Sequence, residues 1–299
     1  TIILNGNLSP SHIGDRFINE YRRIYDERLK AKSQGDKVTA DTLKISLNGT
    51  FGKLASPHSI LYAPDLMLAV TMTGQFTLLM LIELLEQEGA TILSANTDGI
   101  VIRVADYNEQ SVRWCVQEFE ELSGFTFEYT PYEKLAMKDV NNYIAVKKDG
   151  TIKSKGIYSS VSLRKNPTAP VCAHAVGQWL AHGSSFGSTI NNASFDMFIT
   201  ARNVAGGGVQ GGKYLGKVVR WYQSTKATEP IVYANNNNKV PKSDGAQACM
   251  QVDDWSVKPD DLDTQWYINE CIDIAHNIGA EHFLDVTEIF MANFGVKND

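Results

Sequence analysis

Two short segments, about fifty residues apart, most constrain what this chain can fold into. The first runs from Lys44 to Gly52 and reads KISLNGTFG, a pattern that favours a helix. Side chains four positions apart leave the same face of a helix, so Lys44 and Asn48 lie one above the other. The second segment, residues 96–99, separates two apolar runs that favour strands, and it predicts a hairpin with Asp98 at its tip.

These two elements point to one kind of ligand. A lysine and an amide on one helix face can hold a phosphate, and a carboxylate at the tip of a hairpin is free to reach a metal ion. Together they can grip a nucleoside triphosphate. Each segment alone is ordinary, because an Asp-x-Gly hairpin is commonly a plain surface turn. The order of the two segments and the residues around them must therefore carry the prediction.

The first segment resembles the fingers helix of the family B DNA polymerases, which reads Lys-x-x-x-Asn-x-x-(Tyr/Phe)-Gly. The second resembles the palm hairpin of the same family, Tyr-x-Asp-Thr-Asp-Ser, with two departures. Asn96 stands in place of the first aspartate and Gly99 in place of serine, which leaves Asp98 at the position of the second aspartate. The resemblance implies that Lys44 and Asn48 contact the triphosphate and that Asp98 binds Mg²⁺. Among the family, the bacteriophage-type members are the expected relatives.

The stretch before the first segment extends the resemblance. Residues 15–33 show helical spacing of apolar side chains and end at Gly35, so they predict a helix antiparallel to the one that carries Lys44. Arg28 and Lys32 are again four positions apart and can face the same cavity. Family B fingers use a matching Arg-x-x-x-Lys pair on the triphosphate, which implies that role here. The alternative is a solvated basic face.

A second metal ligand is expected from another segment. In family B it is the aspartate of an Asp-x-x-Ser-Leu-Tyr-Pro-Ser segment upstream of the fingers, and Thr1–Asn5 resembles the residues that follow it. Two-metal phosphoryl transfer needs carboxylates that hold both ions. We therefore expect a C-terminal polymerase portion, inactive by itself, whose partner is an N-terminal fragment or chain. No exonuclease carboxylate cluster is recognisable.

Charge is distributed unevenly along the chain, whose formal net charge is -6. Residues 57–150 hold 6 basic and 14 acidic residues, net -8, whereas residues 151–228 hold 9 basic and 1 acidic, net +8. The acidic block around Asp98 suits metal binding, and the basic block suits contacts with the phosphate backbone of DNA. The acidic tail, residues 253–299, is expected to face solvent or a protein partner.

At the start of the basic block, residues 142–146 and 152–156 predict a hairpin around an Asp-Gly turn. It resembles the family's Lys-x-Tyr segment at the primer end, with Tyr143 as the tyrosine and Asn141 in place of the lysine. The resemblance implies that Tyr143 contacts the primer, and packing is the alternative. The expected DNA contacts of this hairpin are Tyr143, Lys153 and Lys155.

A glycine-rich stretch, residues 206–212, is followed by cations and aromatic residues. Flexible glycine backbone next to cations can follow a phosphate chain, and the rings of Trp221 and Tyr222 can pack on sugars. The stretch is not a Walker loop, because the hydroxyl residue after the lysine is missing. A surface loop followed by a buried strand is the alternative. The expected DNA contacts are Lys213, Lys217 and Arg220.

The order of elements predicts an α+β palm. Residues 66–88 predict a long apolar helix, which polar and acidic side chains interrupt before it reaches the roughly 20 apolar residues of a membrane span. We therefore expect this helix beneath a sheet and no membrane partner. Strands are expected at 91–95, 100–104 and 125–130, with a helix at 107–123. After residue 159 a mainly helical thumb is expected, with helices at 167–182, 192–201, 264–278 and 286–294. The right-hand polymerase architecture then consists of fingers at 1–56, palm at 57–158 and thumb at 159–299.

The remaining features are permissive. The four cysteines lack Cys-x-x-Cys spacing and predict neither a zinc site nor disulfides. No signal peptide is recognisable, so we expect a cytoplasmic protein, in the host cell if it is viral. The prediction is a DNA-directed DNA polymerase that uses Mg²⁺, primer-template DNA and deoxynucleoside triphosphates, with Lys44 also protonating the leaving pyrophosphate. The alternatives are a non-catalytic DNA-binding remnant or subunit, and an RNA-making or reverse-transcribing enzyme.

Overall fold

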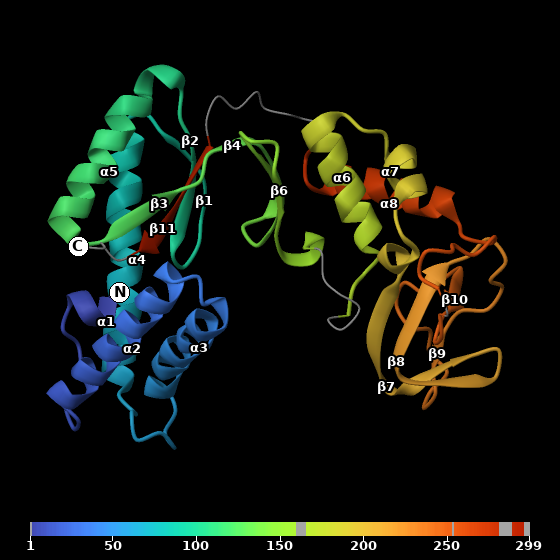
Figure 1. The fold of residues 1–299 in the computed structure, drawn as a ribbon, viewed down its shortest axis with the longest axis horizontal. Coiled ribbons are helices and arrows are strands. Elements are labelled where there is room, and N and C mark those ends of the chain that lie inside the picture. Colours follow the sequence, from blue (N-terminus) through green and yellow to red (C-terminus); the bar gives the residue numbers. More distant parts are fainter. Residues whose placement is uncertain (1, 160–165, 253, 281–288, 296–299) are drawn as a thin grey trace. The chain divides into compact units, whose positions relative to one another are not determined.

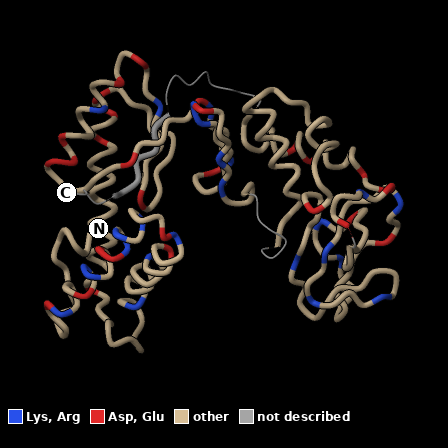
Figure 2. Tube along the Cα trace, in the orientation of Figure 1, with Lys and Arg blue, Asp and Glu red and all other residues tan. Residues whose placement is uncertain are grey.

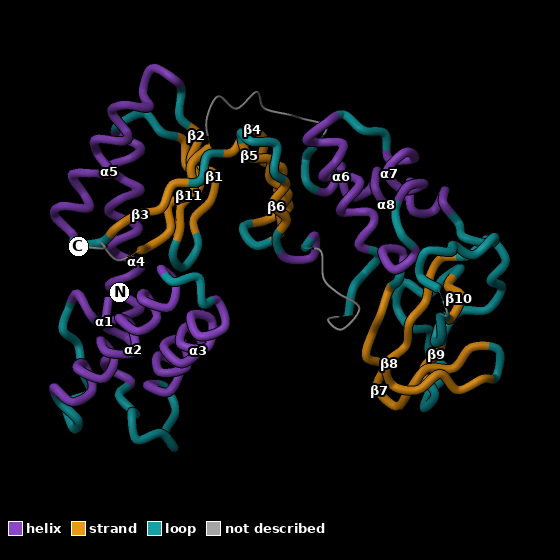
Figure 3. Tube along the Cα trace, in the orientation of Figure 1, coloured by secondary structure: helices purple, strands orange, loops and turns teal. Residues whose placement is uncertain are grey.

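The computed structural model describes residues 2–159, 166–252, 254–280 and 289–295. The chain divides into two compact units (Figure 1). The first consists of Thr1–Thr130 with Phe290–Asp299, and the second of Pro131–Ile289. Each unit contains both helices and strands, as the colours of Figure 3 show, so the predicted α+β class is confirmed. The first unit combines the expected fingers with residues 57–130 of the expected palm, and residues 131–158 belong to the second unit.

The first unit begins with helices, and two of them form the expected hairpin. Its first helices are α1 Ile2–Asn5, α2 Asp15–Ser33, α3 Lys37–Leu54 and α4 Pro64–Gln87. The chain reverses between α2 and α3 at Gly35, whose φ of 75° is a left-handed conformation that suits glycine. Asp36 then caps α3, because its Oδ1 accepts a hydrogen bond from the Thr39 amide at 3.1 Å. The pair α2–α3 packs as one helical hairpin.

The sheet of the first unit presents the predicted hairpin. Its strands and helices are β1 Thr91–Ala95, β2 Gly99–Arg103, η1 Asp106–Asn108, α5 Glu109–Ser123, β3 Thr126–Tyr129 and β11 Ile289–Gly295. β1 and β2 are antiparallel, with Ala95 opposite Ile100, and β3 is antiparallel to β11. The predicted strands, helix and turn of this segment are therefore confirmed. The predicted helix at 286–294 is wrong for residues 289–294, which form β11, and its first residues lie outside the described ones.

Helix α4 packs beneath this sheet, as expected. Leu78, Leu81 and Leu85 share one buried cluster with Ile100 and Ile102 of β2. By length and composition alone α4 could cross a membrane, and 28% of its most apolar window is buried within the structure. Its other face leaves several large apolar side chains exposed, namely Leu68, Phe76, Leu79, Met80 and Leu84.

The second unit opens with three antiparallel strands and continues with helices. These elements are β4 Tyr132–Asp139, β5 Asn142–Lys147, β6 Ile152–Ser154, η2 Gly156–Tyr158, α6 Pro170–His182, α7 Phe186–Asn192, η4 Phe195–Phe198 and α8 Thr264–Asn277. The predicted β5–β6 hairpin is confirmed, with its turn closed by a bond from the Thr151 amide to Asp149 Oδ1 at 2.8 Å. Helices α6 and α8 confirm the predicted helices at 167–182 and 264–278, and they share a core with Ile144 of β5. The predicted helix at 192–201 is wrong, because α7 ends at Asn192 and only the short η4 follows before a strand.

A four-stranded antiparallel sheet occupies much of the segment that was expected to be mainly helical. Its strands are β7 Thr200–Gln210, β8 Lys213–Gln223, β9 Val232–Tyr233 and β10 Ala246–Ala248, in the order β10-β8-β7-β9. Gly211 and Gly212 connect β7 to β8 with φ of 57° and 74°, the pair of left-handed residues that a two-residue hairpin turn prefers. The glycine-rich stretch is therefore strand and turn, with a bulge between Asn203 and Gly208, and not a loose loop.

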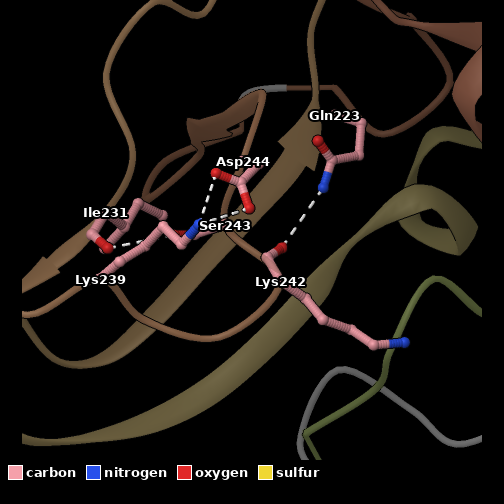
Figure 4. A network of polar contacts seen from close by, with 6 residues as sticks. All are labelled: Gln223, Ile231, Lys239, Lys242, Ser243 and Asp244. Carbon is pink, nitrogen blue, oxygen red and sulfur yellow. Dashed lines mark hydrogen bonds and ion pairs between the residues drawn. The ribbon is translucent and has the colours of Figure 1, made fainter.

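The turn-rich segment that follows β9 is tied down by a polar network (Figure 4). Lys239 Nζ contacts both carboxylate oxygens of Asp244 at 2.8 Å, and Ser243 Oγ donates to the Ile231 carbonyl at 3.0 Å. The side-chain amide of Gln223, from the end of β8, reaches the backbone of residues 242–245. These contacts fasten residues 231–245 to the sheet although many of them are exposed.

The packing of α4 on β2 predicts that two leucines of this helix contribute very differently to the free energy of unfolding. Leu81 has no exposed surface, whereas Leu84 is 37% exposed. We expect Leu81→Ala to lower the free energy of unfolding of the first unit by about 2–5 kcal/mol, because it leaves a cavity, and Leu84→Ala to cost much less. Urea denaturation followed by circular dichroism measures both. Equal losses in the two variants would contradict the described core.

Candidate functional site

The α2–α3 hairpin carries all four residues that the resemblance assigns to triphosphate binding. Lys44 and Asn48 are both exposed on α3, while Leu47 between them is buried. Arg28 and Lys32 lie on α2, with Arg28 half-buried and Lys32 exposed. The predicted helical placement is confirmed for each residue, and the packing of α2 on α3 brings the two pairs onto one hairpin. The assignment of a triphosphate to them stays a prediction.

Arg28 is the most constrained of these cations. Its Nε atom is buried and has no hydrogen-bond partner among the described residues. Burial raises the pKa of nearby Tyr25, and the positive charge of Arg28 opposes that rise. An unsatisfied guanidinium donor of this kind is unusual in a folded protein, and an anionic ligand is one way to satisfy it.

Lys32 connects the helical hairpin to the sheet of the first unit. Its Nζ lies 4.0 Å from Glu128 Oε1 on β3, and both side chains are largely exposed, at 66% and 71%. An ion pair this long and this exposed contributes little to stability. Lys32 is therefore free to exchange Glu128 for another anion at low energetic cost.

Asp98 lies at the tip of the β1–β2 hairpin, as predicted, and it is exposed. Asn96 shapes this tip through two hydrogen bonds. Its side-chain Oδ1 accepts from the backbone N–H of Asp98 at 3.1 Å, and its backbone N–H donates to the Gly99 carbonyl at 2.9 Å. The residue that replaces the family's first aspartate thus acts as a turn former. Within the described ranges, no group of three or more His, Cys, Asp or Glu side chains is arranged to hold a metal ion.

The expected primer contact of Tyr143 needs correction, because its side chain is only 4% exposed. Its ring packs in β5 next to Tyr132, whose hydroxyl accepts a hydrogen bond from Lys153 Nζ at 2.8 Å. Burial raises the pKa of both tyrosine hydroxyls. Tyr143 is a buried packing residue of β5, and Lys148, in the turn, and Lys155, just past β6, are exposed cations of this hairpin.

The second group of expected DNA contacts lies on β8. Lys213 and Lys217 are exposed there, and Arg220 is half-buried with an Nε atom that has no partner among the described residues. The nearby aromatic residues do not fit the expectation, because Trp221 and Tyr222 are 1% and 8% exposed. Figure 2 shows the basic positions of the β5–β6 hairpin and of β8, in contrast with the acidic positions along α5. The exposed aromatic side chain of β8 is Tyr214, which we did not single out from the sequence although it directly follows Lys213.

Comparison with known proteins found a DNA polymerase of low sequence identity. No family model matches the chain. In sequence it is 24% identical over 146 residues to DNA polymerase 1 of Saccharolobus solfataricus, a match of 45% of this chain and 16% of that protein. In structure it is similar to the family B DNA polymerase from the hyperthermophilic archaeon Pyrobaculum calidifontis, with a TM-score of 0.48 and 16% identity, over 91% of this chain and 40% of that chain.

The chain thus spans less than half of each of these relatives. The sequence match supports a relationship to DNA polymerases, while the activity, substrates and partners of the whole enzymes are matters for proposal. Neither relative is a bacteriophage protein, so the bacteriophage-type assignment stays a prediction.

The contact between Lys32 and Glu128 generates a test of triphosphate binding. We expect Glu128→Gln to tighten binding of a deoxynucleoside triphosphate by up to roughly fivefold at low salt, because it removes a competing carboxylate. Calorimetric titration of the chain with dATP measures the affinity. Glu118→Gln, an exposed glutamate of α5, is the matched control. An identical effect of both substitutions would show that only the net charge matters.

Proposed function

We propose that this chain is the fingers, palm and thumb portion of a DNA-directed DNA polymerase of family B. The observation that supports the proposal is the presence, in one compact unit, of two elements: the α2–α3 hairpin with its phosphate-binding residue types and the β1–β2 hairpin with Asp98 at its tip. The sequence match to a DNA polymerase supports it independently of these residues' roles.

In this proposal the helical hairpin binds and orients the incoming deoxynucleoside triphosphate. Lys44 and Asn48 contact its phosphates from α3, and Arg28 and Lys32 contact them from α2. The primer hydroxyl then attacks the α-phosphorus in line and releases its proton to water, while the bond to the pyrophosphate breaks. Lys44 donates a proton to the leaving pyrophosphate and is reprotonated from solvent. The protein contributes positioning and positive charge, which supply most of the catalysis in phosphoryl transfer.

The described residues fit a magnesium site only in part. Asp98 is exposed and offers one carboxylate, the ligand type that Mg²⁺ prefers. Asn96 uses its side-chain oxygen in the turn, and the described residues hold no cluster of three acidic or metal-binding groups. Two-metal sites neutralise charge on the transferring phosphoryl group and need further carboxylates. We therefore propose that another segment or chain supplies the second aspartate, and we assign no metal-dependent step to these residues alone.

The proposal predicts the effect of two substitutions in the assembled enzyme. Primer extension is measured with this chain together with a polypeptide that supplies the second metal-binding aspartate. We expect Asp98→Asn to abolish extension and Lys44→Ala to slow it by roughly 10²–10⁴-fold, because each removes a group that acts on the phosphates. DNA binding by fluorescence anisotropy should persist in both variants.

Matched controls exist on the same elements or near them. Asp106→Asn, on η1, and Lys53→Ala, on the last turn of α3, change the same charges at exposed positions outside the proposed site. Their extension rates should stay within a factor of a few of the unchanged enzyme. Normal extension by Asp98→Asn, or equal losses in the controls, would remove the proposed mechanism.

Contacts with duplex DNA are proposed for the basic surface of the second unit, formed by Lys153, Lys155, Lys213, Lys217 and Arg220. Each lysine that contacts a phosphate adds about 0.9 to the slope of log affinity against log salt concentration. We expect Lys217→Gln to lower this slope by about one. Lys239→Gln is the control, because that lysine is already paired with Asp244 at 2.8 Å. An unchanged slope in Lys217→Gln contradicts the contact.

A second candidate function is favoured by the turn at Asn96. A chain that retains the fold and binds DNA without catalysis is expected if no upstream partner restores extension. This non-catalytic DNA-binding remnant or subunit predicts normal DNA affinity, normal salt dependence and no extension in any assembly.

A further inference from the structure

A pocket of about 710 Å³ lies beside the β7–β8 turn in the second unit. We call it the hairpin pocket. Its walls come from the turn and the start of β8, from residues 226–229 and from residues 247–251. We propose that the hairpin pocket binds one unpaired nucleotide of a nucleic-acid strand. Its volume is within the roughly 300–1,000 Å³ of small-ligand sites, and its side chains match the three parts of a nucleotide.

Tyr214 provides the surface on which a base can stack. The residue is 56% exposed and lines the pocket. Its ring rests against the backbone of Gly207, where a Cβ atom would lie 2.3 Å from Tyr214 Cε2. Gly207 has a φ of 97°, so this close approach depends on glycine. The ring is therefore held in place from one side, and an aromatic ring held in this way stacks on any base with little further loss of entropy.

Apolar and amide groups complete the base-binding side. Met250 is 36% exposed and lines the same pocket, as does Leu215. Gln247 and Gln251 also line it, and each amide offers a donor and an acceptor for the edge of a base. An unpaired base exposes the edge that such amides can reach, whereas a duplex covers it.

Gln210 makes the walls of the pocket a rigid frame. Its Nε2 donates to the carbonyls of Glu229 at 2.8 Å and Ala246 at 2.6 Å, and its Oε1 accepts from the Ala248 amide at 2.9 Å. One side chain thus joins the end of β7 to both other walls. A ligand entering this frame finds it preorganised, which lowers the cost of binding.

The charges of the pocket favour a singly charged phosphodiester over a triphosphate. Lys213 and Lys226 line it and are exposed, and Lys226 also interacts electrostatically with the carboxylate of Asp261, which does not line the pocket. Glu229 lines it as well, so the three charged side chains sum to one positive charge. This balance suits the single negative charge of a phosphodiester in a strand. It disfavours a triphosphate, whose several negative charges Glu229 would repel.

The inference is independent of the proposed polymerase chemistry, because every residue of the hairpin pocket belongs to the second unit, and Asp98 and Lys44 belong to the first. Binding is measured with the intact chain and a fluorescein-labelled dT12 strand by anisotropy, without nucleotides or partner. We expect Tyr214→Ala to weaken binding by roughly tenfold or more and Tyr214→Phe to retain it, because the ring does the stacking. Lys213→Gln and Lys226→Gln should each reduce the salt slope by about 0.7, the value for one phosphate contact on a single strand.

Tyr107→Ala is the matched control, since Tyr107 is an 86% exposed tyrosine of the first unit. Thermal unfolding of Tyr214→Ala by circular dichroism separates loss of the pocket from loss of the fold. Photocrosslinking of a strand that carries 5-iodouracil, followed by mass spectrometry, should label Tyr214 or Met250. Equal affinity of Tyr214→Ala and the unchanged chain, or labels confined to other residues, overturns the proposal.

Two competition experiments identify the source of the nucleotide. Unlabelled dT12 should displace the probe, and a duplex of the same length should displace it at least tenfold less well in the Lys217→Gln background, where duplex binding is weakened. Displacement by free dTMP as effective as by dT12 would overturn the assignment to a strand. Failure of primer extension with retained, Tyr214-dependent strand binding would remove the polymerase proposal and leave this inference intact.

Discussion

The burial of α4 beneath β1 and β2 is the interaction on which the first unit depends. Leu81 and Leu85 share a cluster with Ile100 and Ile102, and this packing holds the two strands in register up to the turn that carries Asp98. Exposed side chains at a hairpin tip contribute little to stability themselves. The position of Asp98 is therefore set by apolar residues several positions away, which is how a rigid scaffold presents a reactive group on a loop.

In the helical hairpin, too, buried residues hold the helices together while neighbouring polar residues stay exposed. Leu47 is buried while Lys44 and Asn48 on either side of it face solvent, so one residue anchors α3 and two remain available for a ligand. On α2, Arg28 is half-buried and its Nε has no hydrogen-bond partner in the described part of the chain, and Lys32 makes a long, exposed ion pair with Glu128. The described residues give these cations little stabilisation through ion pairs or hydrogen bonds. Their charge is available for an anion, and this is why we connect them with a triphosphate.

The second unit uses glycine for a different purpose. Gly211 and Gly212 form the tight turn between β7 and β8, and Gly207 lets the ring of Tyr214 lie directly on the backbone. These positions build a defined surface with one exposed aromatic ring, two lysines and one glutamate. In our proposals, the cations of the first unit bind a strongly charged ligand, and the weakly positive pocket of the second unit binds a singly charged one.

The sequence alone determined the local elements whose patterns are complete within a few residues. The i, i+4 spacing of Lys44 and Asn48, the apolar strands around Asp98 and the Asp-Gly turn after β5 each predicted the observed element, because helix faces and hairpin turns depend on neighbours in the chain. Tertiary structure decided the rest. Tyr143, Trp221 and Tyr222 became core residues, and Tyr214 stayed exposed, because burial depends on which strands pair and what packs on them. The strand β11 likewise formed from a segment with helical spacing, since pairing with the distant β3 outweighed a local preference.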